Sequence, residues 1–385
     1  MENLVVSGLK LGIIAGGQLG KMLSLAASNW DISTHILDRD ENCPAASCCT
    51  SLVKGDPMNF EAVYSFGKQV DMLTFEVENV NVEALKRLKE EGLRILPDPV
   101  HLELIQDKGL QKQFYRDHGI PTATFRLFDN REDILTGIRN GSLCLPFVQK
   151  LRRGGYDGMG VAVVNKPEDL GRMLDGPSIV EEKVEIYREV SVIVARNGNG
   201  EIKSFPAVEM EFNHQANLVE HLLCPAVLPQ EIQEDTEEQA RRVISGLGLT
   251  GILAVEMFVD RNRQIWVNEI APRPHNSGHH TIESVITSQF EQLLRAIFNF
   301  PLGSTRLKMP AVMVNLLGEP GHNGKAHYEG LTKCMRLEGV KIHLYGKKIT
   351  RPYRKMGHVT ILDPSMEEAL KKAEFIKKTI KITSW

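Results

Sequence analysis

Two acidic residues, Glu256 and Glu269, each lie inside a short apolar segment that is typical of a buried strand. A turn at 260–263 separates the segments, so an antiparallel pair would bring the carboxylates nearly opposite each other. Buried carboxylates side by side repel each other unless a cation lies between them. Hard oxygen ligands of this kind suit Mg²⁺, which also keeps water and phosphate oxygens in its shell. The pair predicts a magnesium site; the alternative is that one carboxylate faces solvent.

A glycine-rich segment follows Lys150, which ends another predicted strand, and four glycines fall within the seven residues 154–160. Backbone amides in such a loop, together with a lysine ammonium, can offset the charge of a triphosphate. The segment lacks the Gly-Lys-Ser/Thr ending of a Walker loop, so it is not a P-loop. It predicts a phosphate-binding loop, with a glycine-rich surface hairpin as the alternative.

Acidic residues also stand at strand ends. Glu181 and Glu182 close one predicted strand, and Glu189 opens the next. Such carboxylates can accept hydrogen bonds from an adenine amine or from ribose hydroxyls. Solvated strand-end acids are the alternative interpretation.

Two further loops carry side chains that suit anions. Segment 271–280 holds three histidines but no carboxylate or cysteine at zinc-ligand spacing, so it favours an anion-holding loop built on Arg273 and His275. Segment 351–358 is rich in arginine and lysine. It predicts a site for a substrate phosphate, or else a surface hairpin.

The first glycine-rich turn, Ala15 to Gly20, follows a strand and opens a helix. Its spacing is that of the dinucleotide-binding turn with alanine at the first glycine, and Asp38 stands where a ribose-binding acid would. Small residues there let the backbone approach a phosphate at a helix N-terminus. A nicotinamide cofactor, a different ligand and a turn without a cofactor all stay open.

Strands and helices must position these residues. In the first third, apolar runs alternate with helical patterns, which predicts a parallel βαβ sheet. We expect strands there at 11–15, 34–38, 71–76 and 94–97, followed by a polar helix at 107–118. Further strands are expected at 145–150, 160–164, 178–182, 190–195, 202–208, 254–259 and 264–270, with helices at 236–247 and 283–298. A β-rich tail and an amphipathic helix at 367–380 close the chain.

Composition excludes several classes of protein. The chain has 385 residues, with 46 Lys+Arg against 49 Asp+Glu, which leaves a net charge of −3. That balance excludes a broadly basic nucleic-acid binder or a polybasic membrane-surface protein. No apolar run approaches the length of about 18 residues that a membrane span needs, and the first residues lack the layout of a secretory signal. The six cysteines show no paired spacing, which predicts reduced thiols and a cytoplasmic location.

Taken together, these motifs resemble the ATP-grasp ligases and, more narrowly, the 5-(carboxyamino)imidazole ribonucleotide synthase family, over about residues 11–358. The most specific matches are Gly154-Gly155-Tyr156-Asp157-Gly158 and the segment from Asn268 to His279. The resemblance implies a mixed α/β and α+β ATP-grasp fold. A Rossmann-like, pre-ATP-grasp βαβ domain (1–105) would precede the ATP-grasp domain (106–300, with 145–210 as a flexible lid lobe) and a β-rich C-terminal domain with a closing helix (301–385).

The resemblance also implies an activity. It is the ATP- and bicarbonate-dependent carboxylation of the amine of 5-aminoimidazole ribonucleotide to 5-carboxyaminoimidazole ribonucleotide, through carboxyphosphate, in de novo purine biosynthesis. ATP and Mg²⁺, with Mn²⁺ as a substitute, would be required. The other partners implied are the small-molecule substrates and a second copy of the chain in a homodimer, with no nucleic acid and no membrane.

Site residues follow from the resemblance position by position. The nucleotide-binding residues would be Lys108, Lys150, Gly155, Tyr156, Asp157, Gly158, Met159, Gly160, Val161, Glu181, Glu182, Lys183, Val184, Glu189, Asn268 and Glu269. Glu256 and Glu269 would hold the metal, and Tyr156, Asp157, Arg273 and His275 would surround bicarbonate and carboxyphosphate as catalytic residues. The ribonucleotide would be bound by Gln18, Glu76, Arg273, His275, Asn276, Arg351, Arg354 and Lys355.

The chain departs from the family pattern at three positions. Ala15 replaces a glycine, Met210 stands where the family has asparagine, and Ala271 occupies the position of a third metal ligand in many ATP-grasp enzymes, a feature that the narrower family shares. Three rival functions remain to be separated. They are a nicotinamide dehydrogenase, a formate-using glycinamide ribonucleotide ligase and a non-catalytic nucleotide sensor.

Overall fold

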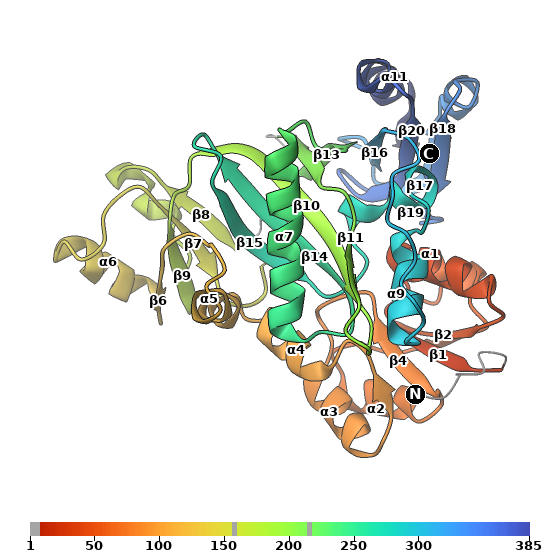
Figure 1. The fold of residues 1–385 in the computed structure, drawn as a ribbon, viewed down its shortest axis with the longest axis horizontal. Helices are drawn as coiled ribbons and strands as arrows, with labels where there is room; N and C mark the ends of the chain where they lie inside the picture. The colour runs from red at the N-terminus through yellow and green to blue at the C-terminus, as the bar shows by residue number, and fades with distance from the viewer. Residues whose placement is uncertain (1–7, 156–159, 214–217) are drawn as a thin grey trace.

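The computed structural model describes residues 8–155, 160–213 and 218–385 (Figure 1). Its N-terminal part is a five-stranded sheet of order β3-β2-β1-β4-β5 in which all neighbours run parallel. Strand β4 is buried along its whole length, as expected for a parallel strand covered on both faces. The predicted βαβ arrangement is confirmed. Its strands are β1 Lys10–Ile14, β2 Ser33–Asp38, β3 Ser51–Lys54, β4 Met72–Phe75 and β5 Arg94–Ile95. Its helices are α1 Gln18–Ser28, α2 Phe60–Gly67, α3 Val82–Glu90 and α4 Pro99–Ile105, with the 3₁₀ turn η1 Pro44–Ser47.

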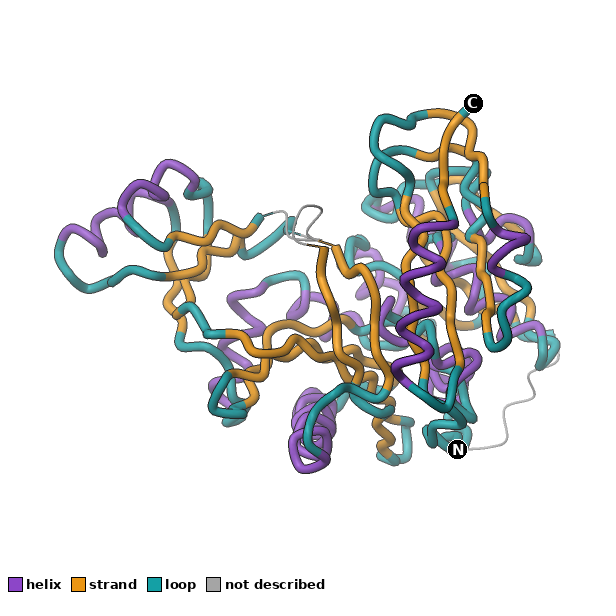
Figure 2. The backbone as a smooth tube through the Cα atoms, turned by 90° about the horizontal axis from the view of Figure 1, so that it is seen from above, coloured by secondary structure: helices purple, strands orange, loops and turns teal. Residues whose placement is uncertain are grey.

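A four-stranded antiparallel sheet of order β6-β9-β7-β8 forms a lobe at one end of the molecule (Figures 1 and 2). A small core of its own, which includes Phe147, Val164 and Val180, holds it together. Helix α5, with Asp107 as its N-cap, leads into the lobe. The elements are α5 Lys108–Asp117, β6 Phe125–Phe128, α6 Arg131–Arg139, β7 Phe147–Leu151, β8 Val161–Val164, η2 Pro167–Arg172 and β9 Ser178–Glu182.

The largest sheet has nine strands, in the order β15-β14-β10-β12-β13-β16-β20-β18 with β11 paired to β10. One face of β10 and β14 carries valines and other apolar residues that pack in one core with helix α7. The opposite face is free to carry polar groups, because side chains alternate along a strand. The elements are β10 Ile186–Arg196, β11 Ile202–Ser204, β12 Val208–Asn213, β13 Leu218–Cys224, α7 Gln230–Leu247, β14 Gly251–Asp260, β15 Ile265–Ala271, η3 Asn276–Gly278, α8 Thr281–Ser284 and α9 Gln289–Ile297.

The same sheet continues into the C-terminal part, because β13 pairs with β16. The domain limit predicted at 300/301 therefore crosses one hydrogen-bonded sheet. Helix α11 packs with β16 and β20 in a shared core. The elements are β16 Ala311–Leu317, β17 Gly324–Glu329, α10 Leu331–Cys334, β18 Val340–Leu344, β19 Ile349–Thr350, β20 Lys355–Leu362, α11 Met366–Thr379 and β21 Lys381–Ser384.

Two helices differ from their predicted bounds. Helix α7 begins at Gln230 rather than 236, because its first turns are polar apart from Ile232 and so lack apolar periodicity. The helix predicted at 283–298 is two helices. Val285 is extended, and Ser288 caps α9 by accepting a hydrogen bond from the backbone N–H of Glu291.

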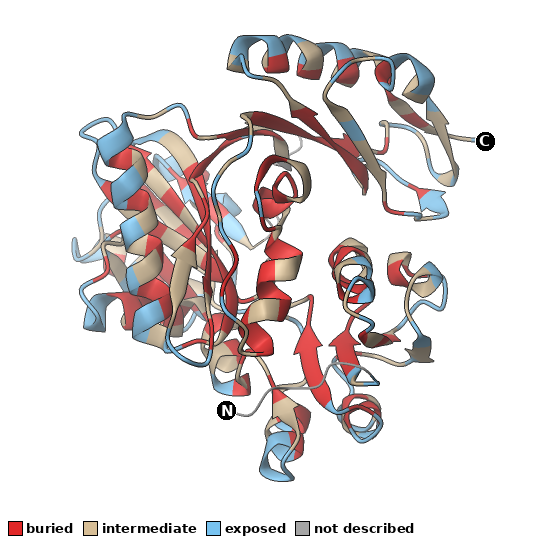
Figure 3. Ribbon diagram, turned by 45° about the vertical axis from the view of Figure 1, so that its right-hand side comes forward, coloured by how far each residue is buried: buried red, intermediate tan, exposed pale blue. Residues whose placement is uncertain are grey.

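Buried residues concentrate along the strands and on the inward faces of the helices (Figure 3). Helix α1 packs against α9 in one core that contains Leu19, Met22, Phe290 and Leu293. This contact fixes the N-terminal sheet beside the large sheet. Within the described ranges, no helix combines the length and apolarity that crossing a membrane requires.

Candidate active site

A cavity of about 950 Å³ lies where the N-terminal sheet, the four-stranded lobe, the large sheet and the C-terminal part meet. It brings together residues predicted from segments far apart in the chain. These are Gln18, Glu76, Lys108, Lys150, Gly155, Val161, Glu181, Glu182, Lys183, Val184, Glu189, Glu256, Asn268, Glu269, Arg273, His275, Asn276, Arg351, Arg354 and Lys355. Of the predicted residues that the structure describes, Gly160 alone is outside this lining. Tyr156, Asp157, Gly158 and Met159 lie outside the described residues.

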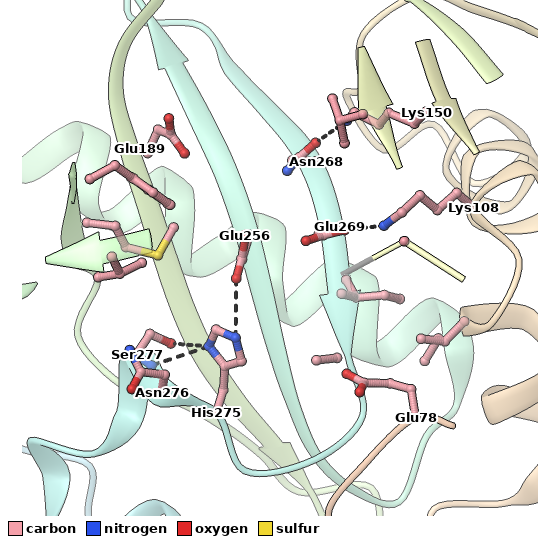
Figure 4. A pocket seen from close by; sticks show the side chains of 18 of the residues that line it. Glu78, Lys108, Lys150, Glu189, Glu256, Asn268, Glu269, His275, Asn276 and Ser277 are labelled. Carbon is pink, nitrogen blue, oxygen red and sulfur yellow. Dashed lines mark hydrogen bonds and ion pairs between the residues drawn. The ribbon is translucent and has the colours of Figure 1, made fainter. Parts of the chain in front are cut away.

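Glu256 on β14 and Glu269 on β15 are direct cross-strand partners, so their carboxylates project from the same face (Figure 4). The predicted opposition is confirmed. A β-bulge directly after this pair makes Asn268 the extra residue of β15, and Asn268 lines the cavity beside Glu269. Burial, together with the charges of Glu269 and Glu189, raises the pKa of Glu256 to about 8. Burial acts in the same direction on Glu269, but the nearby lysines, Lys108 first and then Lys150 and Lys112, together hold the pKa of that carboxyl below its ordinary value.

Lys108 stands at the first position of α5 and its ammonium donates to the Glu269 carboxylate. Asp107 caps the helix by accepting from the backbone N–H of Gly109 at 2.8 Å. The same carboxylate accepts two hydrogen bonds from Arg152, at 2.9 and 2.7 Å, and the Arg152 carbonyl accepts from the Lys108 N–H at 2.9 Å. These bonds tie the chain after β7 to the start of α5, and so hold Lys108 and Lys150 at one side of the cavity.

Lys150 on β7 reaches across to the large sheet. Its ammonium lies 2.7 Å from the side-chain oxygen of Asn268 and 2.8 Å from the Glu181 carboxylate. The second oxygen of Glu181 lies 2.8 Å from Lys112, which is buried. Burial would raise the pKa of Glu181, but the two lysines lower it. Although Glu181 lines the cavity as predicted, its carboxylate therefore serves as the shared partner of two lysines.

The loop after β15 brings Arg273 and His275 to the carboxylate pair. The Arg273 guanidinium lies 2.6 Å from Glu78, which follows β4. His275 Nε2 lies 3.3 Å from Oε1 of Glu256 (Figure 4). Burial, with the charges of Arg273 and Lys355, lowers the pKa of His275 well below its usual value. The imidazole is therefore neutral at physiological pH.

At the opposite wall, Glu76 closes the N-terminus of α1. Its two carboxylate oxygens accept from the backbone N–H groups of Gly17 and Gly20, each at 2.5 Å. Burial raises its pKa to about 7, although these two hydrogen bonds oppose the shift. Asp38 accepts from the Gly16 N–H at 2.7 Å. The amides that would face a dinucleotide pyrophosphate are thus already bonded, which argues against the nicotinamide interpretation.

The basic end of the cavity is formed by Arg351, Arg354 and Lys355, as predicted, together with Lys347. The Lys347 ammonium donates to the Lys355 carbonyl at 2.7 Å. Burial, followed by the charge of Arg354, lowers its pKa to about 8. Four cationic side chains at one wall make this end suitable for a phosphate.

Sequence reasoning missed Lys112, Glu78 and Lys347 as lining residues. Lys112 follows Lys108 by four positions on the predicted helix, so the two share a helix face and this signal was available. No pattern in the sequence marks Glu78 or Lys347. Met210, one of the departures from the family pattern, is buried and lines the cavity with an apolar side chain.

The arrangement suits a metal-bound polyphosphate. Two facing carboxylates need a cation, and Mg²⁺ is commonly held by one or two carboxylates with phosphate oxygens and water filling its shell. In the ranges that the structure describes, no cluster of three or more histidine, cysteine, aspartate or glutamate side chains could hold a metal alone. Phosphate oxygens of the nucleotide and water would thus supply the remaining ligands.

Comparisons with known families agree along the chain. The ATP-grasp domain family matches residues 113–290, the ribonucleotide synthetase pre-ATP-grasp domain residues 9–106, and the phosphoribosylaminoimidazole carboxylase C-terminal domain residues 311–372. The predicted fold class is confirmed.

Individual relatives are similar over nearly the whole chain. The N5-carboxyaminoimidazole ribonucleotide synthase of Synechococcus elongatus is 37% identical, with 94% of this chain and 91% of that protein covered. The chloroplastic phosphoribosylaminoimidazole carboxylase of Vigna aconitifolia is 36% identical over 92% of this chain, but this chain spans only 64% of that longer protein.

Solved structures agree as well. The N5-carboxyaminoimidazole ribonucleotide synthetase of Thermotoga maritima is 42% identical, with a TM-score of 0.90 over 98% of this chain and 100% of that one. The Aspergillus clavatus N5-carboxyaminoimidazole synthase, in complex with ADP and 5-aminoimidazole ribonucleotide, is 31% identical, with a TM-score of 0.88 over 97% of this chain and 99% of that one. With this identity sustained over nearly the full length of such relatives, the chain belongs to the N5-carboxyaminoimidazole ribonucleotide synthase family of ATP-grasp proteins.

Proposed function

We propose that this protein carboxylates the amine of 5-aminoimidazole ribonucleotide at the expense of ATP and bicarbonate, through carboxyphosphate, as a step of de novo purine biosynthesis. The observation that carries the proposal is one cavity with three charged regions in contact. These are a lysine-flanked carboxylate pair, an Arg273–His275 loop and a basic wall at 351–355. The relative from Aspergillus clavatus binds ADP and 5-aminoimidazole ribonucleotide, the two ligands that the outer regions suit.

ATP would lie between the lobe and the large sheet. Lys108 and Lys150 would face its phosphates, Glu189 its ribose, and residues 181–184 its adenine. Burial raises the pKa of Glu189 to about 7, an effect that Lys150 partly offsets. A ribose hydroxyl that donates to this carboxylate would stabilise its charged form. Because the Glu181 carboxylate is held by Lys112 and Lys150, we expect the backbone of 181–184 to meet the adenine.

Mg²⁺, or Mn²⁺ in its place, would be held by Glu256 and Glu269, and it would neutralise charge that develops on the phosphates. The facing carboxylates, with a raised pKa at Glu256, fit that role. Lys108, which is paired with Glu269, would contact the same phosphates once the carboxylate has a metal partner. Positioning and charge neutralisation of this kind are the main protein contributions to phosphoryl transfer.

Bicarbonate and the carboxyphosphate formed from it would lie against Arg273 and His275. Arg273 is held by Glu78, and its guanidinium suits a planar carboxylate-like anion. His275 is neutral and presents a ring nitrogen toward Glu256. Tyr156 and Asp157 remain predictions for this step, with Asp157 expected to orient bicarbonate or to handle the proton released by the attacking amine.

The ribonucleotide phosphate would lie against Arg351, Arg354 and Lys355, with Gln18, Glu76 and Asn276 contacting the rest of the molecule. Bound in this way, the ribonucleotide would direct its aminoimidazole toward Arg273 and His275, which also line the cavity. A homodimer and a cytoplasmic location are part of the proposal. Light scattering coupled to size-exclusion chromatography tests the former.

The proposal is tested by ADP release from Mg-ATP with 5-aminoimidazole ribonucleotide, with and without added bicarbonate. We expect release that needs the ribonucleotide and rises with bicarbonate. The matched control is Glu269→Gln, which keeps the side-chain shape and should bind nucleotide weakly and turn over no substrate. Release with glycinamide ribonucleotide and formate instead would keep the fold and change the substrate. No release under either condition would leave a nucleotide-binding protein without this activity.

A further inference from the structure

Two buried serines connect the large sheet to the ring of His275. Ser191 lies in the middle of β10, where it is the cross-strand partner of Glu256, so both side chains project from the same face. Ser277 lies in η3, two residues after His275. Each serine is 1% exposed, and their hydroxyl oxygens are 2.9 Å apart.

The direction of hydrogen bonding in this group is set by a backbone amide. The N–H of Ser277 can only donate, and it donates to Nδ1 of His275 at 3.3 Å. Nδ1 must then be the unprotonated ring nitrogen, because a proton there would face the amide proton. The Ser277 hydroxyl, 2.9 Å from the same Nδ1, donates to it as well. That leaves the Ser277 oxygen free to accept from the Ser191 hydroxyl.

The other ring nitrogen then carries the proton. Nε2 of His275 lies 3.3 Å from Oε1 of Glu256, inside the cavity (Figure 4). With the proton fixed on Nε2, the ring presents a hydrogen-bond donor to whatever anion lies against Glu256. It has no free lone pair on that side with which to accept a proton.

The backbone of His275 is fixed independently of its ring. The buried amide of Gln289 accepts from the His275 N–H at 2.9 Å and donates to the His275 carbonyl at 2.8 Å. A side chain at Gly278 would come within 2.4 Å of the same amide, so the loop has no room to shift there. Loss of a serine hydroxyl therefore weakens the hold on the ring, which keeps the Ser277 N–H as a donor to Nδ1, without releasing the loop.

We propose that Ser277, through its backbone N–H and its hydroxyl, and Ser191, through the Ser277 hydroxyl, are positioning residues that hold His275 as the Nε2–H tautomer, so that it acts as a hydrogen-bond donor to the reacting anion and not as a general base. The turnover part of this inference rests on the proposed function. The tautomer part does not, because it concerns only this chain's own residues.

The tautomer is read first, by ¹⁵N NMR of the histidine rings in the ligand-free protein, with His275→Gln used to assign the His275 signals. The two ring nitrogens of a neutral imidazole resonate far apart, according to which one carries the proton. We expect Nδ1 of His275 to be the unprotonated nitrogen in the wild-type protein. A protonated Nδ1 would overturn the proposal, whatever the enzyme is found to catalyse.

Turnover is then compared in Ser277→Ala, Ser191→Ala and the double variant. Each single change should lower kcat about tenfold or less, the factor that one neutral hydrogen bond contributes, with KM for ATP unchanged. Because Ser191 acts through Ser277, the double variant should be no slower than Ser277→Ala. Additive losses would refute the relay. Ser277→Thr, which keeps the hydroxyl, should retain more activity than Ser277→Ala.

Ser284→Ala is the matched control. It removes another buried serine hydroxyl that is bonded to a histidine Nδ1, that of His280 at 2.7 Å, but Ser284 does not line the cavity. Its kcat should equal that of the wild type, and an equal loss would indicate a general packing effect. Should Ser277→Ala fail to fold, as judged by its melting curve, the wild-type tautomer and Ser191→Ala still decide the question. A wild-type protein without ATP-dependent turnover would refute the proposed function and leave the tautomer result standing.

Discussion

The buried Glu181 carboxylate offers a quantitative test of how the nucleotide side of the cavity is held together. Its two oxygens lie 2.8 Å from the ammonium groups of Lys112 and Lys150, and the exposed fractions of the three side chains are 5%, 3% and 13%. Glu181→Gln removes the only negative charge of this group and keeps the side-chain shape. The two ammonium groups, which line the cavity, would then keep only the more distant carboxylates of Glu269 and Glu189 as counter-charges.

The size of the effect follows from burial. Breaking a buried ion pair by removing one partner costs about 3–5 kcal/mol, because the remaining charge is left uncompensated. A folding unit of about 200 residues, the size of the ATP-grasp domain, loses roughly 2–4 °C of Tm for each kcal/mol of lost unfolding free energy. Glu181→Gln should therefore lower the Tm of the ligand-free protein by roughly 6–20 °C.

Lys112→Met provides the rescue. Burial already lowers the pKa of Lys112 to about 8, so this ammonium is costly to keep charged, and Glu181 would retain Lys150 as a partner. Lys112→Met alone should cost about 1 kcal/mol or less. The double variant should melt above Glu181→Gln, because the uncompensated ammonium has been replaced by an apolar chain of similar length.

Differential scanning calorimetry of the four proteins, without nucleotide or metal, measures both effects. A Tm of Glu181→Gln within roughly 2–4 °C of the wild type, equal to about 1 kcal/mol, would mean that the buried pair behaves as an exposed one. A further fall in the Tm of Glu181→Gln on adding Lys112→Met would also contradict this prediction.

Three other predictions concern separate features. Glu256→Gln removes the cost of burying this carboxyl beside Glu269, the cost that raises its pKa to about 8, so the ligand-free variant should melt above the wild type. The variant should also lose the extra stabilisation by ADP that Mg²⁺ provides in thermal-shift assays, and a ligand-free variant that melts lower would contradict this explanation. Burial lowers the pKa of His280 from 6.5 to about 3. Between these two values the unfolded chain binds a proton at His280 and the folded chain does not, so stability is lost as the pH falls from 6.5 toward 3. At about pH 5 the loss amounts to roughly 2 kcal/mol. His280→Asn should show a smaller fall in Tm between neutral and acid buffer, and an identical fall would exclude His280 as a source. Ala15 has a φ of 71°, a left-handed conformation that is strained for a β-branched residue. In urea unfolding, Ala15→Val should therefore lower the free energy of unfolding by about 2 kcal/mol, while Ala15→Gly should stay within about 1 kcal/mol of the wild type. Equal unfolding midpoints for the two variants would refute this prediction.

The sequence predicted best those features that depend on local pattern. Apolar runs located four of the five strands of the parallel sheet and the β14–β15 pair, but they missed β3 Ser51–Lys54. The turn between β14 and β15 was enough to place Glu256 opposite Glu269. Type and spacing also identified Lys150 and the Arg351 segment as cavity residues, and the family resemblance identified Lys108.

What the sequence could not predict depends on contacts between distant segments. Asn268 lines the cavity beside Glu269 because a β-bulge leaves it without a partner residue on β14. The apolar pattern of a strand does not indicate which of its residues a bulge will leave unpaired. The side chain of Gln289, at the start of α9, makes two hydrogen bonds to the backbone of His275, fourteen positions earlier in the chain. The large sheet crosses the predicted boundary at 300/301 because β13 pairs with β16. Pairing between strands that lie so far apart in the sequence leaves no local signal in either strand.

The most direct test of the account follows the carbon itself. Purified protein would be supplied with Mg-ATP, ¹³C-bicarbonate and 5-aminoimidazole ribonucleotide labelled with ¹⁵N in its exocyclic amine, and the mixture examined by NMR in alkaline buffer, where carbamates persist. We predict a new ¹³C carboxyl signal with one-bond coupling to ¹⁵N, formed only when ATP is consumed and absent with Glu269→Gln. ATP consumption without that coupling, or a ¹³C carboxyl bonded to a ring carbon, would contradict the central claim.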